Sequence, residues 1–120
     1  RVLFRSDDEK EKLSGDNDYI LSGFPPNSPY WSFVIYDFDN RRIEPFEETV
    51  ANSYQTPIKK NGSYEITLTK HPDNYPGKQV INHAGANFSI IMRIYGPILK
   101  YYTDKESIPV GSIKKVKYNG

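Results

Sequence analysis

At 120 residues, with 14% aromatic side chains and a formal net charge of +1, the chain has the length of one domain and enough large apolar groups to form a core. The near-neutral charge argues against bulk attraction to nucleic acid or to an anionic membrane surface. The absence of cysteine excludes disulfides, thiolate catalysis and cysteine-ligated metals, and no apolar run reaches the roughly 20 residues that span a bilayer.

Short strand patterns separated by turns fill the first thirty residues. Residues 1–5 alternate in polarity and predict a short strand, whereas residues 6–12 predict an exposed charged turn, with one turn of helix as the alternative. Residues 18–22 predict a second strand. Residues 24–29 contain three prolines, which lack an amide donor and restrict φ, so we expect a connecting loop there.

Residues 30–38 form the longest apolar and aromatic run. In a strand, Trp31, Phe33 and Ile35 would share one face. The opposite face would carry Tyr30, Val34, Tyr36 and Phe38. Because both faces are apolar, the run predicts a central strand that is covered on both sides.

The rest of the chain continues this pattern. Residues 49–54 predict a weaker strand, and Asn61-Gly62 predicts a hairpin with a type I′ turn, in which both central residues take positive φ. Residues 64–69 then alternate between apolar and polar side chains, which predicts one buried and one solvent-exposed face. Residues 88–94 and 112–118 predict two further strands.

These patterns predict a single all-β domain over residues 1–120. We expect an antiparallel β-sandwich or a jelly roll with little or no helix, in which residues 98–120 form a basic C-terminal strand or tail. The predicted core contains Leu21, Trp31, Phe33, Ile35, Ile66, Leu68, Phe88, Ile90, Met92 and Ile94.

Four segments between residues 13 and 97 also carry a family resemblance. They are Leu13-Ser14-Gly15-Asp16-Asn17-Asp18-Tyr19-Ile20-Leu21, Tyr30-Trp31-Ser32-Phe33-Val34-Ile35-Tyr36-Asp37-Phe38-Asp39-Asn40, Asn61-Gly62-Ser63-Tyr64-Glu65-Ile66 and Arg93-Ile94-Tyr95-Gly96-Pro97. In this order they resemble the Leu-x-Gly-x-Asn-x-Tyr, Trp-Ser-Leu-Thr-Leu-Tyr-Asp-like, Asp-Gly-Ser and Arg-Leu-Tyr-Gly-Pro segments of the family called domain of unknown function 1214.

The resemblance implies a β-sandwich of jelly-roll type, in agreement with the strand patterns, and little chemistry, because the role of that family is largely undefined. Family members often carry a further domain, number 1254 in the same series, on the N-terminal side, and we expect it to lie outside these 120 residues. The chain departs from the family at residues 79–83, where Gln-Val-Ile-Asn-His replaces an Asn-Trp-Leu-Pro-like segment. We therefore expect any functional surface there to be altered.

One candidate binding or structural cluster lies at the ends of the two central strands. It consists of Asp37 and Arg93, with Tyr36 and Tyr95 beside them. The functional interpretation is a charged pair in a pocket with tyrosine walls. The structural alternative, which we favour, is a partly buried ion pair that fixes strand register, because a buried charge without its partner is costly.

A second candidate is a ligand-facing loop region containing His71, Asn82, His83 and Tyr75. The imidazoles of His71 and His83, with the Asp73 carboxylate and Asn82 nearby, could bind zinc or another divalent ion, but such sites need three or four ligands and the sequence indicates no third at a suitable spacing. We therefore expect neither a metal nor a cofactor.

Sugar binding and catalysis are the alternatives with a chemical basis. Tyr75, Tyr101, Tyr102 and Trp31 could stack on sugar rings, although Trp31 fits a core position better. A carboxylate pair for glycoside hydrolysis could come from Glu47, Glu48 and Glu65, but the chain contains no motif for a nucleophile or for phosphate-cradling catalysis.

The sequence therefore predicts a non-catalytic structural or interaction module that is part of a larger protein or assembly. We expect a protein partner or self-association, and no nucleic acid. The alternatives are a carbohydrate-binding module and an accessory domain of an enzyme that a partner domain completes.

Overall fold

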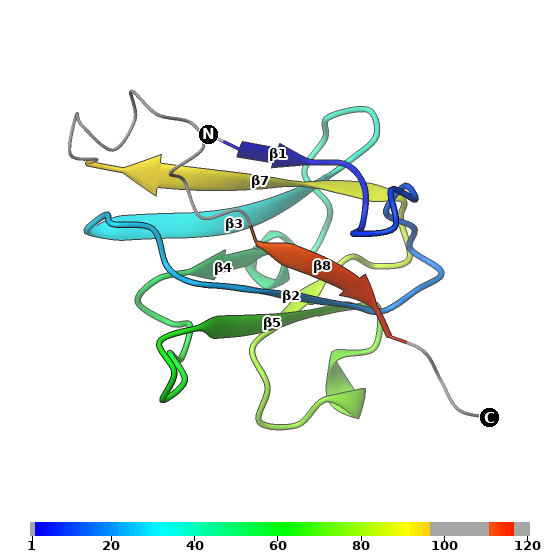
Figure 1. Cartoon of the computed structure of the whole chain (residues 1–120). Coiled ribbons are helices and arrows are strands. Elements are labelled where there is room, and N and C mark those ends of the chain that lie inside the picture. Colours follow the sequence, from blue (N-terminus) through cyan, green and yellow to red (C-terminus); the bar gives the residue numbers. More distant parts are fainter. Residues whose placement is uncertain (1, 97–110, 117–120) are drawn as a thin grey trace.

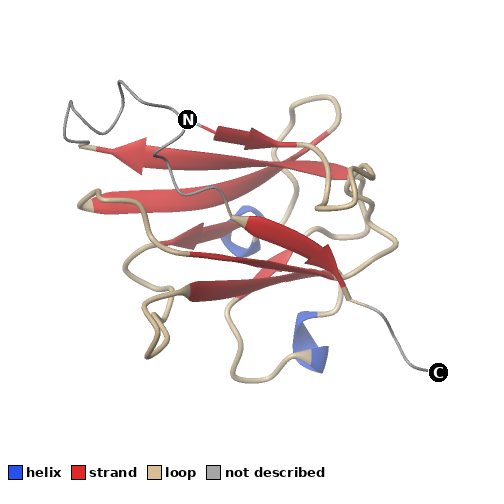
Figure 2. Ribbon diagram, in the orientation of Figure 1, coloured by secondary structure: helices blue, strands red, loops and turns tan. Residues whose placement is uncertain are grey.

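The computed structural model describes residues 2–96 and 111–116. Their strands are β1 (Val2–Phe4), β2 (Tyr19–Gly23), β3 (Tyr30–Asp37), β4 (Val50–Asn52), β5 (Tyr64–Thr69), β6 (Val80–Asn82), β7 (Phe88–Tyr95) and β8 (Ser112–Lys115). Two short 3₁₀ turns, η1 (Phe46–Glu48) and η2 (Pro72–Asn74), are the helical elements of this part of the chain (Figure 2). The predicted all-β class with little or no helix is confirmed.

The strands form two four-stranded sheets that pack face to face (Figure 1). The first sheet has the order β1-β7-β3-β4, and the second has the order β6-β5-β2-β8. Paired strands are antiparallel except β5 and β6, which run parallel. The β-sandwich is therefore confirmed with one parallel pair, and its jelly-roll subtype stays a prediction.

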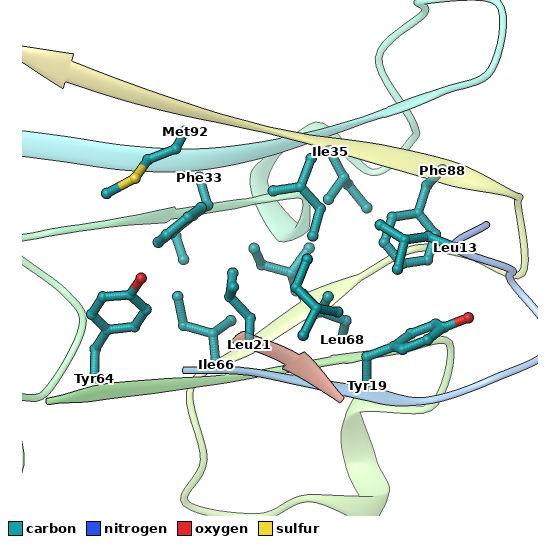
Figure 3. Close-up of a cluster of buried hydrophobic side chains, with 14 of the residues drawn as sticks. Leu13, Tyr19, Leu21, Phe33, Ile35, Tyr64, Ile66, Leu68, Phe88 and Met92 are labelled. Atoms are coloured by element: carbon teal, nitrogen blue, oxygen red, sulfur yellow. The ribbon is translucent and has the colours of Figure 1, made fainter. Parts of the chain in front are cut away.

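The core fills the space between the sheets, where alternate residues of each strand point inward (Figure 3). Nine of the ten predicted core residues are buried there, and Ile94 is partly buried against them. Tyr64 also lies in the core, on the face of residues 64–69 that alternation predicts to be buried. The core residues that the sequence analysis missed are Leu13, Tyr19, Ile43, Ala51, Ile81 and Ile113. Tyr19 can be buried because its hydroxyl accepts hydrogen bonds from the Ser14 amide (2.9 Å) and the Asn17 side chain (3.3 Å).

Tyr64 has a different environment, because its buried hydroxyl has no hydrogen-bond partner among the described residues. Burial raises the pKa of this phenol to about 12. Gly23 lies opposite Tyr64 in the sheet, and a Cβ atom on Gly23 would be 2.8 Å from the Tyr64 hydroxyl. Because Gly23 has no side chain, the Tyr64 hydroxyl can occupy the space beside it.

The prediction of a solvent-exposed face on β5 is wrong for two residues. Thr67 and Thr69 are buried, whereas Glu65 is half-buried and forms an ion pair with Lys59 at 2.5 Å. The reason is the position of β5 between β2 and β6, and the Thr69 hydroxyl accepts the His71 amide hydrogen at 2.9 Å. The flanking strand β6 was not predicted, because its three residues are too few to show an alternating pattern.

The turn at Asn61-Gly62 is tight, but it is not type I′. Gly62 has a φ of 87°, whereas Asn61 is absent from the residues with positive φ. The Gly62 amide donates to the Lys59 carbonyl at 2.9 Å, and the Lys59 amide donates to the Ser63 carbonyl at 2.7 Å. The turn also does not join two paired strands, because the preceding strand β4 belongs to the other sheet.

The charged segment after β1 folds back as a turn and contacts the second sheet. Ser6 and Lys12 form an antiparallel bridge, and the buried Asp7 carboxylate accepts amide hydrogens of the turn. Asp8 bonds to β8: its carboxylate accepts the Ile113 amide hydrogen at 2.9 Å and the hydroxyl hydrogen of Ser112. The bond from Ser112 holds the pKa of Asp8 below its ordinary value.

Candidate functional site

The outer face of the first sheet brings together most of the first predicted cluster. The β3–β7 register places Tyr30 opposite Tyr95, Ser32 opposite Arg93, Val34 opposite Ile91 and Tyr36 opposite Ser89. These eight residues alternate with the buried core residues of the same strands, so they point away from the second sheet. We call this surface, including Leu3 of β1 and Val50 and Asn52 of β4, the outer face.

An apolar row crosses the middle of the outer face. Leu3, Ile91, Val34 and Val50 lie in one register line across the four strands. Arg93 lies on one side of this row and Tyr36 on the other, and the Arg93 guanidinium donates a 2.9 Å hydrogen bond to the Tyr36 hydroxyl. This bond crosses over the Ile91–Val34 pair. The side chains of Ile91 and Val34 are therefore buried, although they lie on the outward-facing side of the sheet.

Three tyrosines gather at one end of the outer face. The Tyr30 ring centroid lies 5.2 Å from that of Tyr54 and 5.3 Å from that of Tyr95, with interplanar angles of 43° and 51°. Tyr54 is 80% exposed and Tyr95 is 45% exposed. We call the three tyrosines, together with Arg93, the tyrosine end. A hydrogen bond with the Tyr95 side chain is the main cause that raises the pKa of Arg93.

Asp37 does not join this group, so the predicted Asp37–Arg93 pair is not formed. The register places Arg93 opposite Ser32, whereas Asp37 lies five residues further along β3, opposite Phe88. The Asp37 carboxylate accepts the amide hydrogens of Asp39 (2.9 Å) and Arg41 (3.0 Å) and so holds the turn after β3. Both charges lie near the C-terminal ends of their strands, and the antiparallel pairing of β3 with β7 places those two ends at opposite sides of the sheet.

A second arginine extends the outer face beyond β3. Arg42 forms a bridge with Tyr36, and its guanidinium lies 6.0 Å from the Tyr36 ring centre and 5.4 Å from that of Phe46. It also donates hydrogen bonds to the Thr49 hydroxyl and the Phe46 carbonyl. Within residues 2–96 and 111–116, neither Arg42 nor Arg93 forms an ion pair with a carboxylate.

The second predicted site is not a ligand-facing loop at His83. This side chain is fully buried and stacks on Phe88, with ring centres 5.0 Å apart. One ring nitrogen, Nε2, lies 2.8 Å from the Asn17 carbonyl, and Nδ1 accepts the Gly85 amide hydrogen at 3.1 Å, so both nitrogens have partners. Burial lowers the pKa of His83, which favours the neutral ring.

The His83 loop is locked against the loop before β2. A Cβ atom on Gly15 would lie 2.1 Å from the Gly85 carbonyl, so only glycine permits this contact. The Gly15 amide also donates to the Asn87 side chain at 3.2 Å. We call this contact the loop lock, and its role is structural.

The other members of the predicted site have separate environments. His71 is exposed, and the Asn82 side chain accepts the Ala84 amide hydrogen at 2.8 Å. Tyr75 is half-buried, and its hydroxyl donates to the buried Asp18 carboxylate at 2.6 Å. No group of three or more histidine, aspartate or glutamate side chains among the described residues is arranged to hold a metal ion.

Tyr75 and Asn82 do share a groove of about 330 Å³ at one edge of the sandwich. The rest of its lining is Glu47, Glu48, Val50, Gln55, Pro72, Lys78, Gln79 and Val80. The other residues proposed to stack on sugars do not contribute: Trp31 is buried in the core, and Tyr101 and Tyr102 lie outside the described residues. Glu65, paired with Lys59, is absent from this lining.

Sequence reasoning missed two members of the candidate surface, Tyr54 and Arg42. Tyr54 belongs to the strand predicted over residues 49–54, but β4 ends at Asn52 and Tyr54 follows it in a turn held by the Asn52 side chain. For Tyr30, the alternation of residues 30–38 was a sufficient signal, since it placed this residue with Tyr36. In the described part of the chain, no helix is long and apolar enough to cross a membrane.

Comparisons with known proteins identify the fold and a family. The family described as "Protein of unknown function (DUF1214)" matches residues 2–98. The crystal structure of the VPA0106 protein from Vibrio parahaemolyticus is 24% identical with a TM-score of 0.81, over 97% of this chain and 30% of that one. An uncharacterised protein from Burkholderia cenocepacia is 14% identical with a TM-score of 0.59, over 86% of this chain and 27% of that one. The comparison with curated proteins gives no match.

Proposed function

Because this chain belongs to the DUF1214 family of proteins of unknown function, we propose its role from its own surface: it is a docking module that binds another protein through the tyrosine end. The observation that carries this proposal is the exposed cluster of Tyr30, Tyr54 and Tyr95 beside Arg93. Tyrosine and arginine are the residue types enriched at protein interfaces and among the residues that dominate binding energy.

The ring geometry favours a protein partner over a sugar. The planes of Tyr54 and Tyr95 are tilted by 43° and 51° to the plane of Tyr30, so the cluster offers ridges and not one flat platform. A ridged aromatic surface can interdigitate with the side chains of a protein partner, whereas sugar rings stack on flat aromatic surfaces.

The charges of the outer face indicate the chemistry of the partner. Arg93 and Arg42 have no carboxylate partner among the described residues, and an interface tends to complement the potential of each surface. We therefore expect a partner segment that combines apolar side chains with carboxylates. The chain spans about a third or less of the two crystal structures that it resembles, which supports a domain that works beside further polypeptide.

The test uses two synthetic peptides of equal length, one alternating leucine with glutamate and the other alternating leucine with lysine. Amide chemical shifts of the whole chain are followed by NMR during titration. We expect the acidic peptide to shift residues around Tyr30 and Tyr95, and Tyr54→Ala or Arg93→Gln to weaken binding by about tenfold or more.

Phe38→Ala is the matched control, because Phe38 is an exposed aromatic residue beyond the opposite end of β3. It should bind the acidic peptide as the parent chain does. Equal binding of the basic peptide, or binding that survives Tyr54→Ala and Arg93→Gln together, would contradict the proposal.

A second candidate function is sugar binding in the groove that contains Tyr75. One aromatic ring, the amides of Gln55, Gln79 and Asn82, and the exposed Glu47 and Glu48 match the mixed aromatic and polar lining that suits a saccharide. Size-exclusion chromatography with light scattering, with and without a panel of soluble glycans, tests this idea. A glycan-dependent shift that Gln79→Ala abolishes would support it, and elution unchanged by every glycan would refute it.

A further inference from the structure

A separate cavity of about 360 Å³ lies beyond the other end of β3, away from the tyrosine end. It is lined by Arg5, Ser6, Lys12, Phe38, Asn40 and Ser89. These residues come from the segment after β1, the turn after β3 and the start of β7, so the cavity depends on three parts of the fold. Its volume is within the range of small-molecule sites.

Backbone hydrogen bonds hold the walls of the cavity. The Ser6–Lys12 bridge and the 3.1 Å bond from the Leu13 amide to the Arg5 carbonyl fix the segment that carries both basic residues. The opposite wall is the turn after β3, where Asn40 has a φ of 62° and the Asp37 carboxylate binds the turn amides. The cavity is therefore set by the fold and does not require a ligand to form its walls.

The charges of the cavity are unbalanced. Arg5 and Lys12 are basic, and among the described residues the lining contains no carboxylate and neither basic side chain forms an ion pair. Ser89, which is 5% exposed as a whole residue, contributes a hydroxyl-bearing side chain to the same lining. Two cations and a hydroxyl that line one cavity are suited to an anion with several acceptor oxygens.

Phosphate fits these groups better than a carboxylate. A guanidinium binds two phosphate oxygens at once and an ammonium adds a second positive charge, so the pair matches a dianion. The Ser89 hydroxyl and the Asn40 amide supply neutral donors for further oxygens. Phe38, which is 47% exposed, provides an apolar wall for an attached organic group.

We propose that this cavity is a binding site for a small phosphomonoester, with the phosphate between Arg5, Lys12 and Ser89 and the organic group against Phe38. The site does not depend on the docking function, because it lies beyond the opposite end of β3 from the tyrosine end.

The test is a calorimetric and NMR titration of the whole chain with three probes: phenyl phosphate, inorganic phosphate and benzoate. We expect phenyl phosphate to bind most tightly and to shift the amide signals of Ser89 and Phe38. Arg5→Gln and Lys12→Gln should each weaken it by about tenfold or more, as loss of a charged hydrogen bond implies. Phe38→Ala should bring its affinity down to that of inorganic phosphate.

Lys60→Gln is the matched control, because Lys60 is an exposed lysine outside the cavity. This variant should bind phenyl phosphate as the parent chain does, and thermal denaturation should show that the exposed Arg5→Gln and Lys12→Gln variants keep the parent stability. Unchanged binding in both cavity variants, or benzoate binding as tight as phenyl phosphate, would overturn the proposal. So would the absence of any shift at Ser89 with millimolar phenyl phosphate.

Discussion

At the scale of single residues, the Tyr64 hydroxyl is the clearest source of an unusual pH dependence. The folded pKa is raised to about 12 by burial, above the ordinary value of 10.0, so the folded state keeps its proton where the unfolded state loses it. Its contribution to stability is therefore complete below about pH 10 and is lost as the pH rises toward about 12.

Tyr64→Phe removes both the titration and a buried hydroxyl without a described partner. We expect the variant to be at least as stable as the parent at neutral pH, with a gain of up to about 1–2 kcal/mol. Between about pH 10 and 12 it should lose less stability than the parent, by an amount on the order of 2 kcal/mol. Urea denaturation across this range measures both effects, and the exposed control Tyr54→Phe should behave as the parent does.

His83 should make the stability of the fold decrease in acid, whereas Tyr64 makes it decrease in base. Because burial lowers the pKa of His83 in the folded state below the ordinary histidine value of 6.5, the unfolded state binds a proton before the folded state does. Its contribution to stability is present above about pH 6.5 and is lost as the pH falls through the lowered folded pKa. Thermal denaturation between neutral pH and about pH 5 should show this loss, and NMR should show that the His83 ring stays neutral below its ordinary pKa.

His71→Gln is the control for that experiment, because the chain has two histidines and His71 is exposed. If this substitution abolished the acid-dependent loss, the assignment to His83 would be wrong. The two positions also show a limit of sequence reasoning, which treated them as equivalent loop residues. Nothing in their neighbouring residues indicates that the loop of one is folded inward against the loop before β2.

At the scale of elements, we expect the loop lock, the contact between Gly15 and Gly85, to tolerate no side chain at Gly15. Gly15→Ala would place a methyl group 2.1 Å from the Gly85 carbonyl, so the two loops must separate. We expect a loss of roughly 1–3 kcal/mol in the free energy of unfolding, as for overpacking elsewhere. Asp16→Ala, at the exposed neighbouring position, should cost much less in the same denaturation experiment. Equal losses would show that the contact with Gly85 is unimportant.

The elements that could be predicted are the long ones. β3 and β7 each have eight residues, enough for alternation to identify both their strand character and their inward faces. β6 has three residues, and its strand character comes from parallel pairing with β5, which is a long-range contact. The turn at Asn61-Gly62 was located correctly but assigned the wrong type, because the segment before it crosses between sheets and does not pair as a hairpin.

The candidate surfaces were harder to predict than the strands. Alternation could place Tyr36, Arg93 and Tyr95 on strands, but their register determines that Arg93 reaches Tyr36 and that Asp37 does not reach Arg93. The cavity proposed to bind a phosphomonoester combines Arg5 with Ser89, which are 84 positions apart in the chain numbering (89 − 5) and carry no motif. Only the pairing of β1 with β7 brings their segments together.

At the scale of the whole molecule, the two sheets share one core, so we expect them to unfold together. Trp31 reports on this core, because it is the single tryptophan, is buried, and lies 5.2 Å from the Tyr64 ring of the other sheet. Urea unfolding followed by Trp31 fluorescence should coincide with unfolding followed by far-ultraviolet circular dichroism. Two separate transitions would mean that the sheets are independent.

Phe33→Ala tests the same core by removing a fully buried ring. We expect it to cost about 3–5 kcal/mol, a large share of the stability of a domain of this size. Leu3→Ala is the matched control, because Leu3 is 44% exposed on the outer face. A Phe33→Ala variant that melts with the parent would refute the core assignment.

The contact between Asp8 and β8 has a consequence for biosynthesis. β8 completes the second sheet beside β2, yet it is translated about ninety residues after β2. Asp8 is translated earlier still than β2, and it forms its bonds to Ser112 and Ile113 only after β8 has been made. A nascent chain that has emerged only as far as β7 therefore holds β2 with one bare edge, open to strands of neighbouring chains. Ribosome stalling before β8 should produce aggregation-prone intermediates, whereas the emergence of β8 protects that edge.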